Sequence, residues 1–374
     1  MKEDKGIKQI NFGSGPAALP PEVLLQASEA VIDYNQTGLS ILEIPHRGNL
    51  FANILEESKA LVKELCELND EYDVLWLQGG GRLQFCMIPM NFLGAQKTAG
   101  YVDSGHWADE AKKYAEYYGN VRVLSSSKES NYSRLPDFPK NIAQDISYLH
   151  VTTNNTIYGT QWGSLPAITT PLIADMSSDI FSRKRGYSNC ALFYAVAQKN
   201  IGAAGATLVV LRKEMTKNIA STIPPMLNYN EQLKKNSVLN TPPVFAIYTS
   251  LLMLRWTRQK SIATIEKESI EKCSLLYNEI ERNTLFTPIV TVKEHRSRMN
   301  ICFAANNYEI EKGFSDFCNQ HYIAGIEGHR TVGGFRFSLY NAITVQQVER
   351  LVSVMQEYEA IQNSKLKTHN YTNG

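Results

Sequence analysis

The sequence predicts an α/β protein with a large, mostly parallel sheet domain followed by a smaller C-terminal α/β domain. Short apolar runs alternate with segments of helical spacing from about residue 21 to residue 211. This alternation is typical of a parallel sheet covered by helices on both faces. After about residue 245, two long helical stretches precede a second mixture of strands and helices, so a second unit is expected there.

In the first part of the chain, apolar residues that recur every three or four positions predict helices at residues 21–34, 50–68, from about 83, and 107–118. Short apolar runs bounded by glycine or polar residues predict strands. These runs lie at residues 73–77, 98–102, 121–124, 146–152, 172–175, 191–195 and 207–211.

In the second part, the same criteria predict helices at residues 244–259, 262–282, 309–320 and 344–361, and strands at 288–293, 298–304 and 335–339. We therefore divide the chain into a large domain at residues 17–258 and a small domain at 259–362. Residues 1–16 form an N-terminal segment that should pack with the small domain. The polar tail at residues 363–374 is expected to be disordered.

The composition excludes several classes of protein. The 374 residues are 43% hydrophobic and 20% charged, and the formal net charge is +1. This balance favours neither nucleic acid nor membrane surfaces as partners, so an anionic ligand must be recognised by local arginines. The charged N-terminus lacks the apolar segment of a signal peptide, and no apolar run is long enough to span a membrane.

The six cysteines show neither a CxxC pair nor the spacing of zinc ligands. Scattered cysteines in a chain of this length are typical of reduced, mostly buried residues. We therefore expect a cytoplasmic protein without a metal at its site.

A lysine directly follows one predicted strand, in the run AVAQKNIG at residues 195–202. Lysine is seldom placed beside a buried strand because burial of an ammonium group costs free energy. A lysine that forms a Schiff base needs such a place, since desolvation lowers its pKa and the strand end aims it. The alternative role of Lys199 is that of a surface residue in a loop between strand and helix.

Asp175 ends the predicted strand at residues 172–175. An acid at the carboxyl end of a parallel strand points into the crevice where α/β proteins bind ligands. Beside a pyridine nitrogen, such a carboxylate would keep the ring protonated and able to accept electrons. The alternative role is to cap a helix N-terminus. Because Asp175 and Lys199 follow successive strands, the two could face one cofactor.

Two further segments lie between a predicted strand and a predicted helix. The turn GGGR at residues 79–82 could bind an anion through free backbone N–H groups at a helix N-terminus. It matches neither GxGxxG nor a P-loop, and a purely structural turn is the alternative. Trp107 could stack on a pyridine ring or belong to the core.

Two His-Arg pairs lie beside glycines, at residues 46–47 and 329–330, and Arg336 follows the second pair. The planar guanidinium group binds carboxylates and phosphates through two parallel bonds. Each arginine alone could equally be a solvated surface residue. Together they predict a pocket for a dianion if the fold brings them together.

These segments together resemble the phosphoserine aminotransferases, which are class V enzymes dependent on pyridoxal 5′-phosphate (PLP). The most specific runs are AQKNIG at residues 197–202, NTPP at 240–243 and GHRTVGGFR at 328–336. Further runs match in family order, such as NFGSGPA at residues 11–17, YVDSG at 101–105 and RSRMN at 296–300. The chain departs from the family pattern at Leu83, Val196 and Pro45, which affects packing more than charge.

The resemblance implies PLP-dependent transferase fold type I and a set of cofactor-binding residues. Lys199 would hold PLP as a Schiff base, and Asp175 would contact the pyridinium nitrogen. Trp107 would stack on the ring, and Thr156 would bond near its hydroxyl group. The residues implied for the cofactor phosphate are Gly81, Arg82 and Gln198, with Asn240 and Thr241 supplied by the partner subunit of a homodimer.

The resemblance also implies how substrates are bound. Arg336 would bind the α-carboxylate of either amino acid. The distal phosphate or γ-carboxylate would be surrounded by residues of both subunits, namely His46, Arg47, Arg82, His329 and Arg330. Lys199, once released by the substrate, would act as the general acid and base.

The implied reaction transfers an amino group between L-glutamate and 3-phosphohydroxypyruvate, giving O-phospho-L-serine and 2-oxoglutarate in serine biosynthesis. 4-Phosphohydroxythreonine of pyridoxine biosynthesis is a further candidate substrate. Another class V enzyme is the alternative: an alanine–glyoxylate aminotransferase should lack the arginine cluster, and a cysteine desulfurase needs a mobile catalytic cysteine. A non-catalytic α/β protein that binds a nucleotide at the glycine turn is an alternative of a different class.

Overall fold

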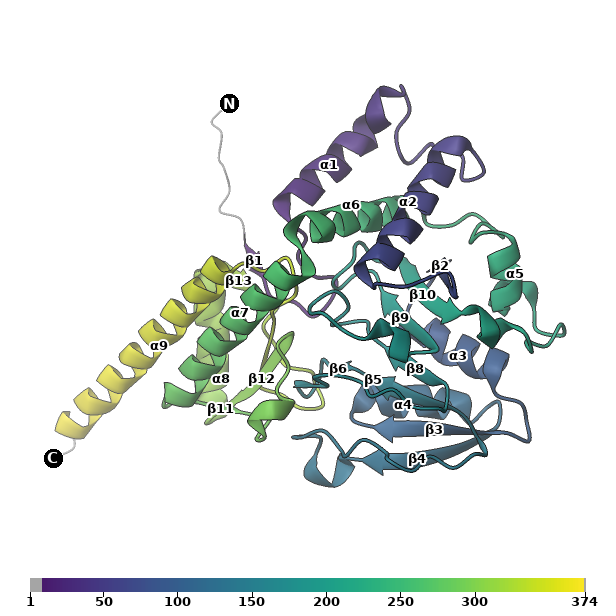
Figure 1. The fold of residues 1–374 in the computed structure, drawn as a ribbon. Helices are drawn as coiled ribbons and strands as arrows, with labels where there is room; N and C mark the ends of the chain where they lie inside the picture. The colour runs from purple at the N-terminus through teal and green to yellow at the C-terminus, as the bar shows by residue number, and fades with distance from the viewer. Residues whose placement is uncertain (1–8, 373–374) are drawn as a thin grey trace.

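The computed structural model describes residues 9–372, with side chains as far as Lys365. Within these residues the chain forms a seven-stranded sheet with helices on both faces, followed by a three-stranded sheet with helices of its own (Figure 1). The large, mostly parallel sheet confirms the α/β class predicted from the sequence.

The strands of the main sheet match the runs predicted from the first part of the sequence. They are β2 (Tyr72–Gln78), β3 (Thr98–Asp103), β4 (Asn120–Ser126), β5 (Ile146–Thr152), β8 (Leu172–Asp175), β9 (Leu192–Val196) and β10 (Ala206–Arg212). Their spatial order is β2-β10-β9-β8-β5-β3-β4, and β10 runs antiparallel to both of its neighbours. The parallel strands β5, β8 and β9 are adjacent, so their carboxyl ends meet at one edge.

Helices of the first part cover this sheet from two sides. They are α1 (Pro21–Ile32), α2 (Asn49–Leu65), α3 (Gly81–Phe92), α4 (His106–Ala115), α5 (Tyr229–Lys234) and α6 (Val244–Lys260). Alternate residues of one strand point to opposite faces. Trp76 packs in the cluster that contains α1, α2 and α6, and its neighbour Leu77 packs with α3 and α4. Both faces are apolar, which is why the strands appear in the sequence as continuous apolar runs.

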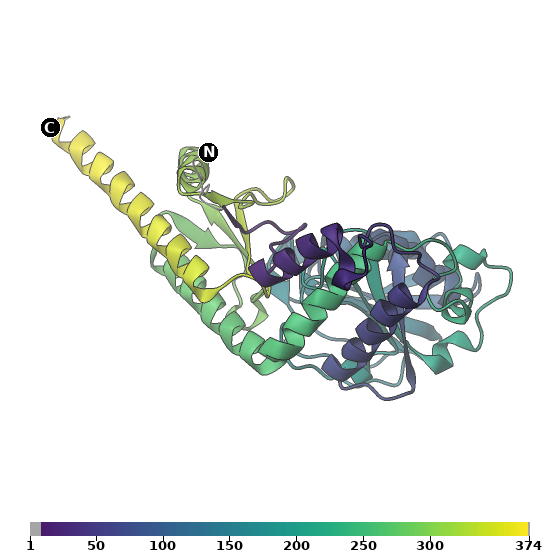
Figure 2. The ribbon, with the colours of Figure 1, turned by 90° about the horizontal axis from the view of Figure 1, so that it is seen from above.

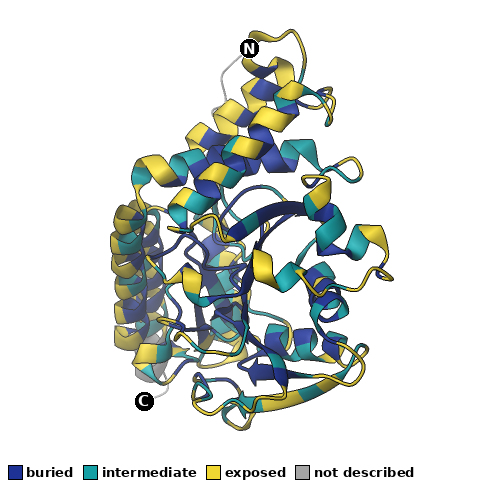
Figure 3. Cartoon of the chain, turned by 45° about the vertical axis from the view of Figure 1, so that its right-hand side comes forward, coloured by how far each residue is buried: buried dark blue, intermediate teal, exposed yellow. Residues whose placement is uncertain are grey.

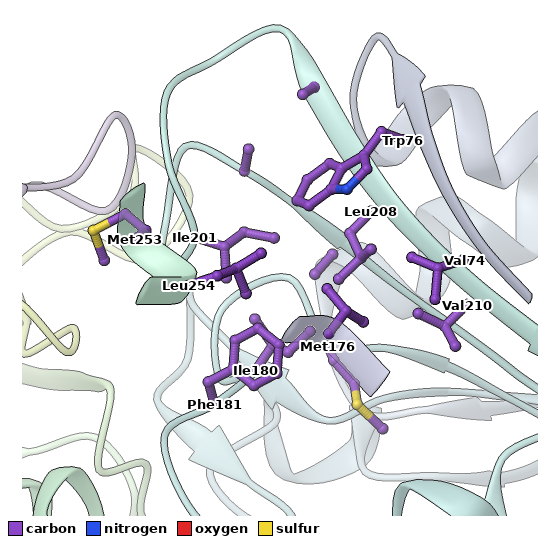
Figure 4. Packing of buried hydrophobic residues seen from close by; sticks show 14 of the residues in the cluster. Val74, Trp76, Met176, Ile180, Phe181, Ile201, Leu208, Val210, Met253 and Leu254 are labelled. Carbon is purple, nitrogen blue, oxygen red and sulfur yellow. The ribbon is translucent and has the colours of Figure 1, made fainter. Parts of the chain in front are cut away.

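The inner strands are almost wholly buried, whereas outer helices such as α1 and α2 have one buried and one exposed face (Figure 3). Trp76 and Leu208, which are paired on β2 and β10, lie side by side in the core (Figure 4). Full burial of a side chain such as Leu208 contributes roughly 1.5–3 kcal/mol. This packing makes the strand ends a rigid platform for the side chains that follow them.

The second part of the chain has its own apolar core. Its elements are α7 (Ile262–Arg282), β11 (Phe286–Pro288), β12 (Asn300–Ala305), α8 (Tyr308–Gln320), β13 (Ile323–Ala324), β14 (Phe335–Ser338) and α9 (Val345–Thr372). Phe12 joins this core, and β1 (Ile10–Asn11) pairs in parallel with β13. Residues 10–12 of the N-terminal segment therefore lie against the C-terminal elements, and residues 1–8 of that segment lie outside the described residues.

The structure differs from the prediction in two places in this part. The strand expected at residues 288–293 lies earlier, at Phe286–Pro288, because Phe286 packs in the apolar core and a turn follows at residues 293–295. Helix α9 continues to Thr372, through most of the tail expected to be disordered, and projects from the body (Figure 2). Extending an existing helix costs far less than starting one.

Among residues 9–372, no helix combines the length and the apolar character that crossing a membrane requires.

Candidate active site

A cavity of about 380 Å³ opens where the carboxyl ends of β5, β8 and β9 meet. The last residues of these strands, Thr152, Asp175 and Val196, all line it. Open α/β sheets bind their ligands at this edge. The predicted site residues that line the cavity are Gly81, Arg82, Trp107, Thr156, Asp175, Gln198, Lys199, His329 and Arg336.

Lys199 lies in the turn after β9, and its amine forms no ion pair with any described residue. Burial lowers the pKa of this amine; the Asp175 carboxylate opposes the shift and the Arg336 guanidinium adds to it. The neutral amine is therefore populated at a lower pH than in an exposed lysine. A neutral amine is the form that attacks a carbonyl group and accepts a proton.

Asp175 is the last residue of β8 and is only 7% exposed. Burial raises the pKa of its carboxyl group, while Lys199 and a hydrogen bond from the Ser177 N–H to Oδ1 at 2.9 Å act against the shift. Within the described chain, no lysine or arginine forms an ion pair with Asp175. A ligand that brings a cationic N–H group here would compensate a buried carboxylate.

A buried polar pair lies behind Asp175. Tyr194 is its neighbour on β9, and hydrogen bonding by the Tyr194 hydroxyl lowers the pKa of the Asp175 carboxyl. The same hydroxyl is 3.0 Å from His150 Nε2. Burial lowers the pKa of His150 to about 3, so its ring is neutral. Because a carboxylate only accepts hydrogen bonds, Tyr194 donates to Asp175 and His150 Nε2 donates to Tyr194.

The GGGR turn forms the N-terminus of α3. Gly79 has a φ of 95°, a conformation that favours glycine, and Gly80 precedes the helix. No side chain caps the helix, and a Cβ added to Gly80 would meet no atom within 4 Å. The first N–H groups of α3 are therefore open to an anion. Leu83, one of the departures from the family pattern, lies inside the first turn and leaves this helix start intact.

Trp107 lies in the first turn of α4, and its Nε1–H donates a hydrogen bond to Thr156 Oγ1 at 3.0 Å. Thr156 follows the short strand β6 (Asn154–Asn155) and is buried. The bond joins two residues predicted to contact a cofactor ring and restricts the orientation of the indole. Trp107 is therefore part of the cavity wall, although its ring also packs at the edge of the core.

The C-terminal part of the chain supplies Arg336 from β14 and His329 from the loop before it. Arg336 Nη1 donates a hydrogen bond to the Thr156 carbonyl at 3.4 Å, and its Nε is buried without a partner in the described chain. Burial lowers the pKa of His329, and the charge of Arg336 lowers it further. Segments from both parts of the chain thus share one cavity.

The remaining predicted residues do not line the cavity: His46, Arg47, Asn240, Thr241 and Arg330. All of these except His46 are exposed, and the Asn240 side chain donates a hydrogen bond to Gln78 Oε1 at 3.0 Å. A single chain does not bring them to Lys199. The four exposed residues are accessible to a second molecule.

Several small polar residues of the cavity escaped the sequence analysis: Ser14, Thr152, Asn154, Ser177 and Ser178. Two signals were available in the sequence: Ser177 and Ser178 lie two and three positions after Asp175, and Ser14 lies in the NFGSGPA run. Their side chains carry no charge, so neither residue type nor spacing distinguished them from ordinary loop residues.

Comparison with known proteins places the chain in a family. The model of the family Aminotransferase class-V matches residues 10–351. A phosphoserine aminotransferase of Flavobacterium psychrophilum is 45% identical over 357 residues, covering 94% of this chain and 99% of the relative. One of Bacillus subtilis is 40% identical over 353 residues, covering 94% of this chain and 98% of the relative.

Solved structures agree with this assignment. A phosphoserine aminotransferase of Bacillus circulans subsp. alkalophilus has a TM-score of 0.92 at 39% identity, covering 95% of this chain and 99% of that one. A PLP-bound phosphoserine aminotransferase of Trichomonas vaginalis has a TM-score of 0.89 at 31% identity, covering 93% and 100%. An alanine–glyoxylate aminotransferase of a Nostoc species, at 16% identity, shares the fold alone. The resemblance found in the sequence is confirmed: the chain belongs to the phosphoserine aminotransferase family of class V aminotransferases.

Proposed function

We propose that this chain transfers an amino group between L-glutamate and 3-phosphohydroxypyruvate, giving O-phospho-L-serine and 2-oxoglutarate, with PLP as cofactor. One observation carries the proposal: Lys199 and Asp175, at the ends of adjacent strands, line a single cavity together with Arg82 and Arg336. The relatives named above support the proposal, because they are phosphoserine aminotransferases and match this chain along nearly their whole length.

The chemistry of the cavity fits PLP. It has a buried carboxylate that forms no ion pair within the described chain, a helix N-terminus without a side-chain cap and an indole face. Three polar atoms that line it lack partners in the described chain: Thr152 Oγ1, Gln198 Oε1 and Arg336 Nε. When bound, PLP supplies an aldehyde that takes up amino groups and a ring that accepts electrons from substrate Cα.

Each group of the cavity then has a role toward the cofactor. Asp175 would hold the protonated ring nitrogen, and Trp107 and Thr156 would position the ring. The start of α3 at Gly81 and Arg82, together with Gln198, would bind the phosphate. Val196, another departure from the family pattern, lies 3.6 Å from a Cβ added to Gly81, so it packs against this helix end.

Lys199 would carry out the proton transfers. Its Nζ would accept the proton that leaves substrate Cα and return a proton when the amino group passes to the oxo acid. Burial and the charge of Arg336 lower the pKa of the amine, which increases the neutral, basic form near neutral pH. The backbone of the turn after β9 holds this amine at the cavity.

Arginines would bind the two anionic groups of each substrate. We assign the α-carboxylate to Arg336, whose Nη1 is anchored on the Thr156 carbonyl and whose Nε is unpartnered. The distal phosphate or γ-carboxylate would meet Arg82 and His329, with His46, Arg47 and Arg330 supplied by one subunit or the other. Glutamate and phosphoserine could then use one pocket, because each carries a distal anion at similar reach.

Replacing Arg336 by lysine should weaken glutamate and phosphoserine alike. Lysine cannot make the bidentate contact with the shared α-carboxylate. The activation free energy derived from kcat/KM should therefore rise by about 2–4 kcal/mol for both substrates. The matched control is Arg298→Lys, because Arg298 pairs with Glu266 and does not line the cavity. If only the phosphorylated substrate suffers, Arg336 belongs to the distal pocket instead.

The reaction itself is tested with a panel of amino acceptors. With purified holoenzyme and glutamate as donor, 3-phosphohydroxypyruvate should be preferred over pyruvate and glyoxylate by on the order of 100-fold or more in kcat/KM, because the latter lack a distal anion. Including the oxo acid of 4-phosphohydroxythreonine tests the second candidate substrate. A preference for glyoxylate with alanine as donor would instead favour an alanine–glyoxylate aminotransferase.

We also propose that the protein acts as a homodimer with shared active sites. Exposed apolar side chains gather on α1 and in the segment after it, namely Leu24, Leu25, Ile32, Leu39 and Leu42. The exposed Asn240 and Thr241 would then reach the cofactor phosphate of the partner subunit. A closed two-fold interface uses the same patch on both chains, so two composite sites would form.

The domain boundaries remain a proposal as well. We assign residues 17–258 to a large domain and residues 259–362 to a small one, with residues 1–16 as an N-terminal segment that packs with the small domain. Separate apolar cores support this division: one set of clusters covers the main sheet, and another joins Phe12 to α7, α8 and α9.

A further inference from the structure

Glu110, which played no part in the predictions, holds the guanidinium group of Arg82. Its Oε1 accepts hydrogen bonds from Arg82 Nε at 3.2 Å and from Nη2 at 3.1 Å. On the other side, the guanidinium carbon lies 5.2 Å from the centre of the Trp107 ring. Trp107 and Glu110 are three positions apart on α4, so one helical turn fixes Arg82 by both a charge and a ring.

This contact leaves part of the guanidinium free. Glu110 occupies the edge formed by Nε and Nη2, and Nη1 donates no hydrogen bond to any described residue. Arg82 itself lines the cavity, whereas Glu110 does not. The remaining N–H groups of Arg82 can therefore bind an anion in the cavity while the two hydrogen bonds to Glu110 stay in place.

Arg82 is the one arginine or lysine of the described chain that forms an ion pair with Glu110. Its side chain is 22% exposed, against 57% for Arg82. Its Oε2 is buried and has no hydrogen-bond partner in the described chain, and His106 Nε2 lies 3.9 Å away. His106 in turn lies beside His329, with their ring centres 5.7 Å apart. A carboxylate thus stands directly behind the proposed anion-binding arginine.

We propose that Glu110 is a specificity-determining residue that lowers the preference of the distal pocket for dianions over monoanions. The inference rests on the proposed function, in which Arg82 meets both the dianionic phosphate of phosphoserine and the monoanionic γ-carboxylate of glutamate. A fixed negative charge repels a dianion twice as strongly as a monoanion at the same place. Glu110 would therefore bring the affinities for the two substrates closer together.

The test uses Glu110→Gln in the holoenzyme. Glutamine keeps an oxygen that accepts both Arg82 bonds but removes the charge. At pH 8, where a phosphate monoester is dianionic, the ratio of the Kd for glutamate to the Kd for phosphoserine should rise roughly 3- to 7-fold. This range corresponds to one extra unit charge acting across the arginine in a well-solvated site. Both Kd values come from titrating the visible absorbance of the bound cofactor.

Asp109→Asn is the matched control. It removes the same charge from the adjacent position of α4, but Asp109 pairs with Lys112 and Lys113 instead of Arg82. The Kd ratio should stay at the wild-type value in this variant. A ratio unchanged in Glu110→Gln, or raised equally in Asp109→Asn, would overturn the inference.

Two further measurements separate this inference from the proposed function. Inorganic phosphate, titrated into the holoenzyme by calorimetry at pH 8, should bind several-fold tighter to Glu110→Gln than to wild type. Arg82→Ala should weaken phosphoserine more than glutamate. If Arg82→Ala changes neither Kd, the distal pocket assigned under the proposed function is wrong. If Arg82→Ala acts as expected and Glu110→Gln does not, only the role of Glu110 fails.

Discussion

Replacing Lys199 by alanine is expected to abolish turnover and the covalent retention of the cofactor. The variant loses both the amine that attaches to the PLP aldehyde and the base that moves the substrate proton. General acid–base catalysis alone is typically worth 10²–10⁴-fold, so kcat should fall by at least about 1,000-fold. Borohydride reduction of wild type, followed by proteolysis and mass spectrometry, should place the adduct on Lys199.

Lys272 offers a control for this assignment because its amine is also buried and its pKa is also lowered by burial. Burial lowers the pKa of Lys272 to about 7, and the residue is only 1% exposed. Its amine is not available to a cofactor, because it is held by backbone carbonyls. Its Nζ donates hydrogen bonds to the carbonyls of Leu339, Tyr340 and Ile343 at 2.8–3.2 Å. Lys272→Met should therefore retain the adduct on Lys199. An adduct on Lys272 or any other lysine would refute the assignment of Lys199.

Two inactive variants are expected to restore activity when they are refolded together. A Lys199→Ala chain and a chain with Asn240→Ala and Arg330→Ala should each be nearly inactive alone. In a heterodimer with shared sites, one site carries every substitution and the other carries none. Random pairing makes about half of the dimers mixed, and each has one intact site of two. Recovered activity should approach roughly a quarter of wild type.

Native mass spectrometry must show that mixed dimers form, since the result depends on their fraction. Lys199→Ala refolded with itself, and the double variant refolded with itself, are the controls for activity gained by refolding alone. Mixed dimers without activity would mean that Asn240, Arg330 or both act within the subunit that carries Lys199. Pairing Lys199→Ala with each single substitution, Asn240→Ala or Arg330→Ala, would then show which of the two residues does so.

The sequence by itself predicted the fold class, which the structure confirms, and the residues at the centre of the candidate site. Apolar runs are a local property, and they placed every strand of the main sheet; the signal is strongest for inner strands such as β8 and β9, which are buried on both faces. The same reasoning located Asp175 and Lys199, since a charged residue next to a buried strand is costly unless it has a function. The resemblance then assigned roles to further residues. The structure brings several of them, such as Trp107 and Arg336, into one cavity with Asp175 and Lys199.

Short and edge elements were less accessible from the sequence. Helix α5 has six residues, too few for a periodic pattern to emerge. The apolar run of β10 would look the same in either direction, so its antiparallel placement could not be predicted. The continuation of α9 into a polar segment depends on the helix already formed before it, and composition alone does not report that.

Only the tertiary structure decided which distant groups meet. The order of strands in the sheet brings the starts of α3 and α4 beside the ends of β8 and β9, and the loop before β14 adds His329. Three contacts near the cavity join segments that are separate in the sequence. They are the hydrogen bond from Trp107 to Thr156, the Tyr194–His150 pair behind Asp175, and the ion pair of Glu110 with Arg82. No local pattern encodes such contacts, because they depend on how strands are ordered and crossed over in three dimensions.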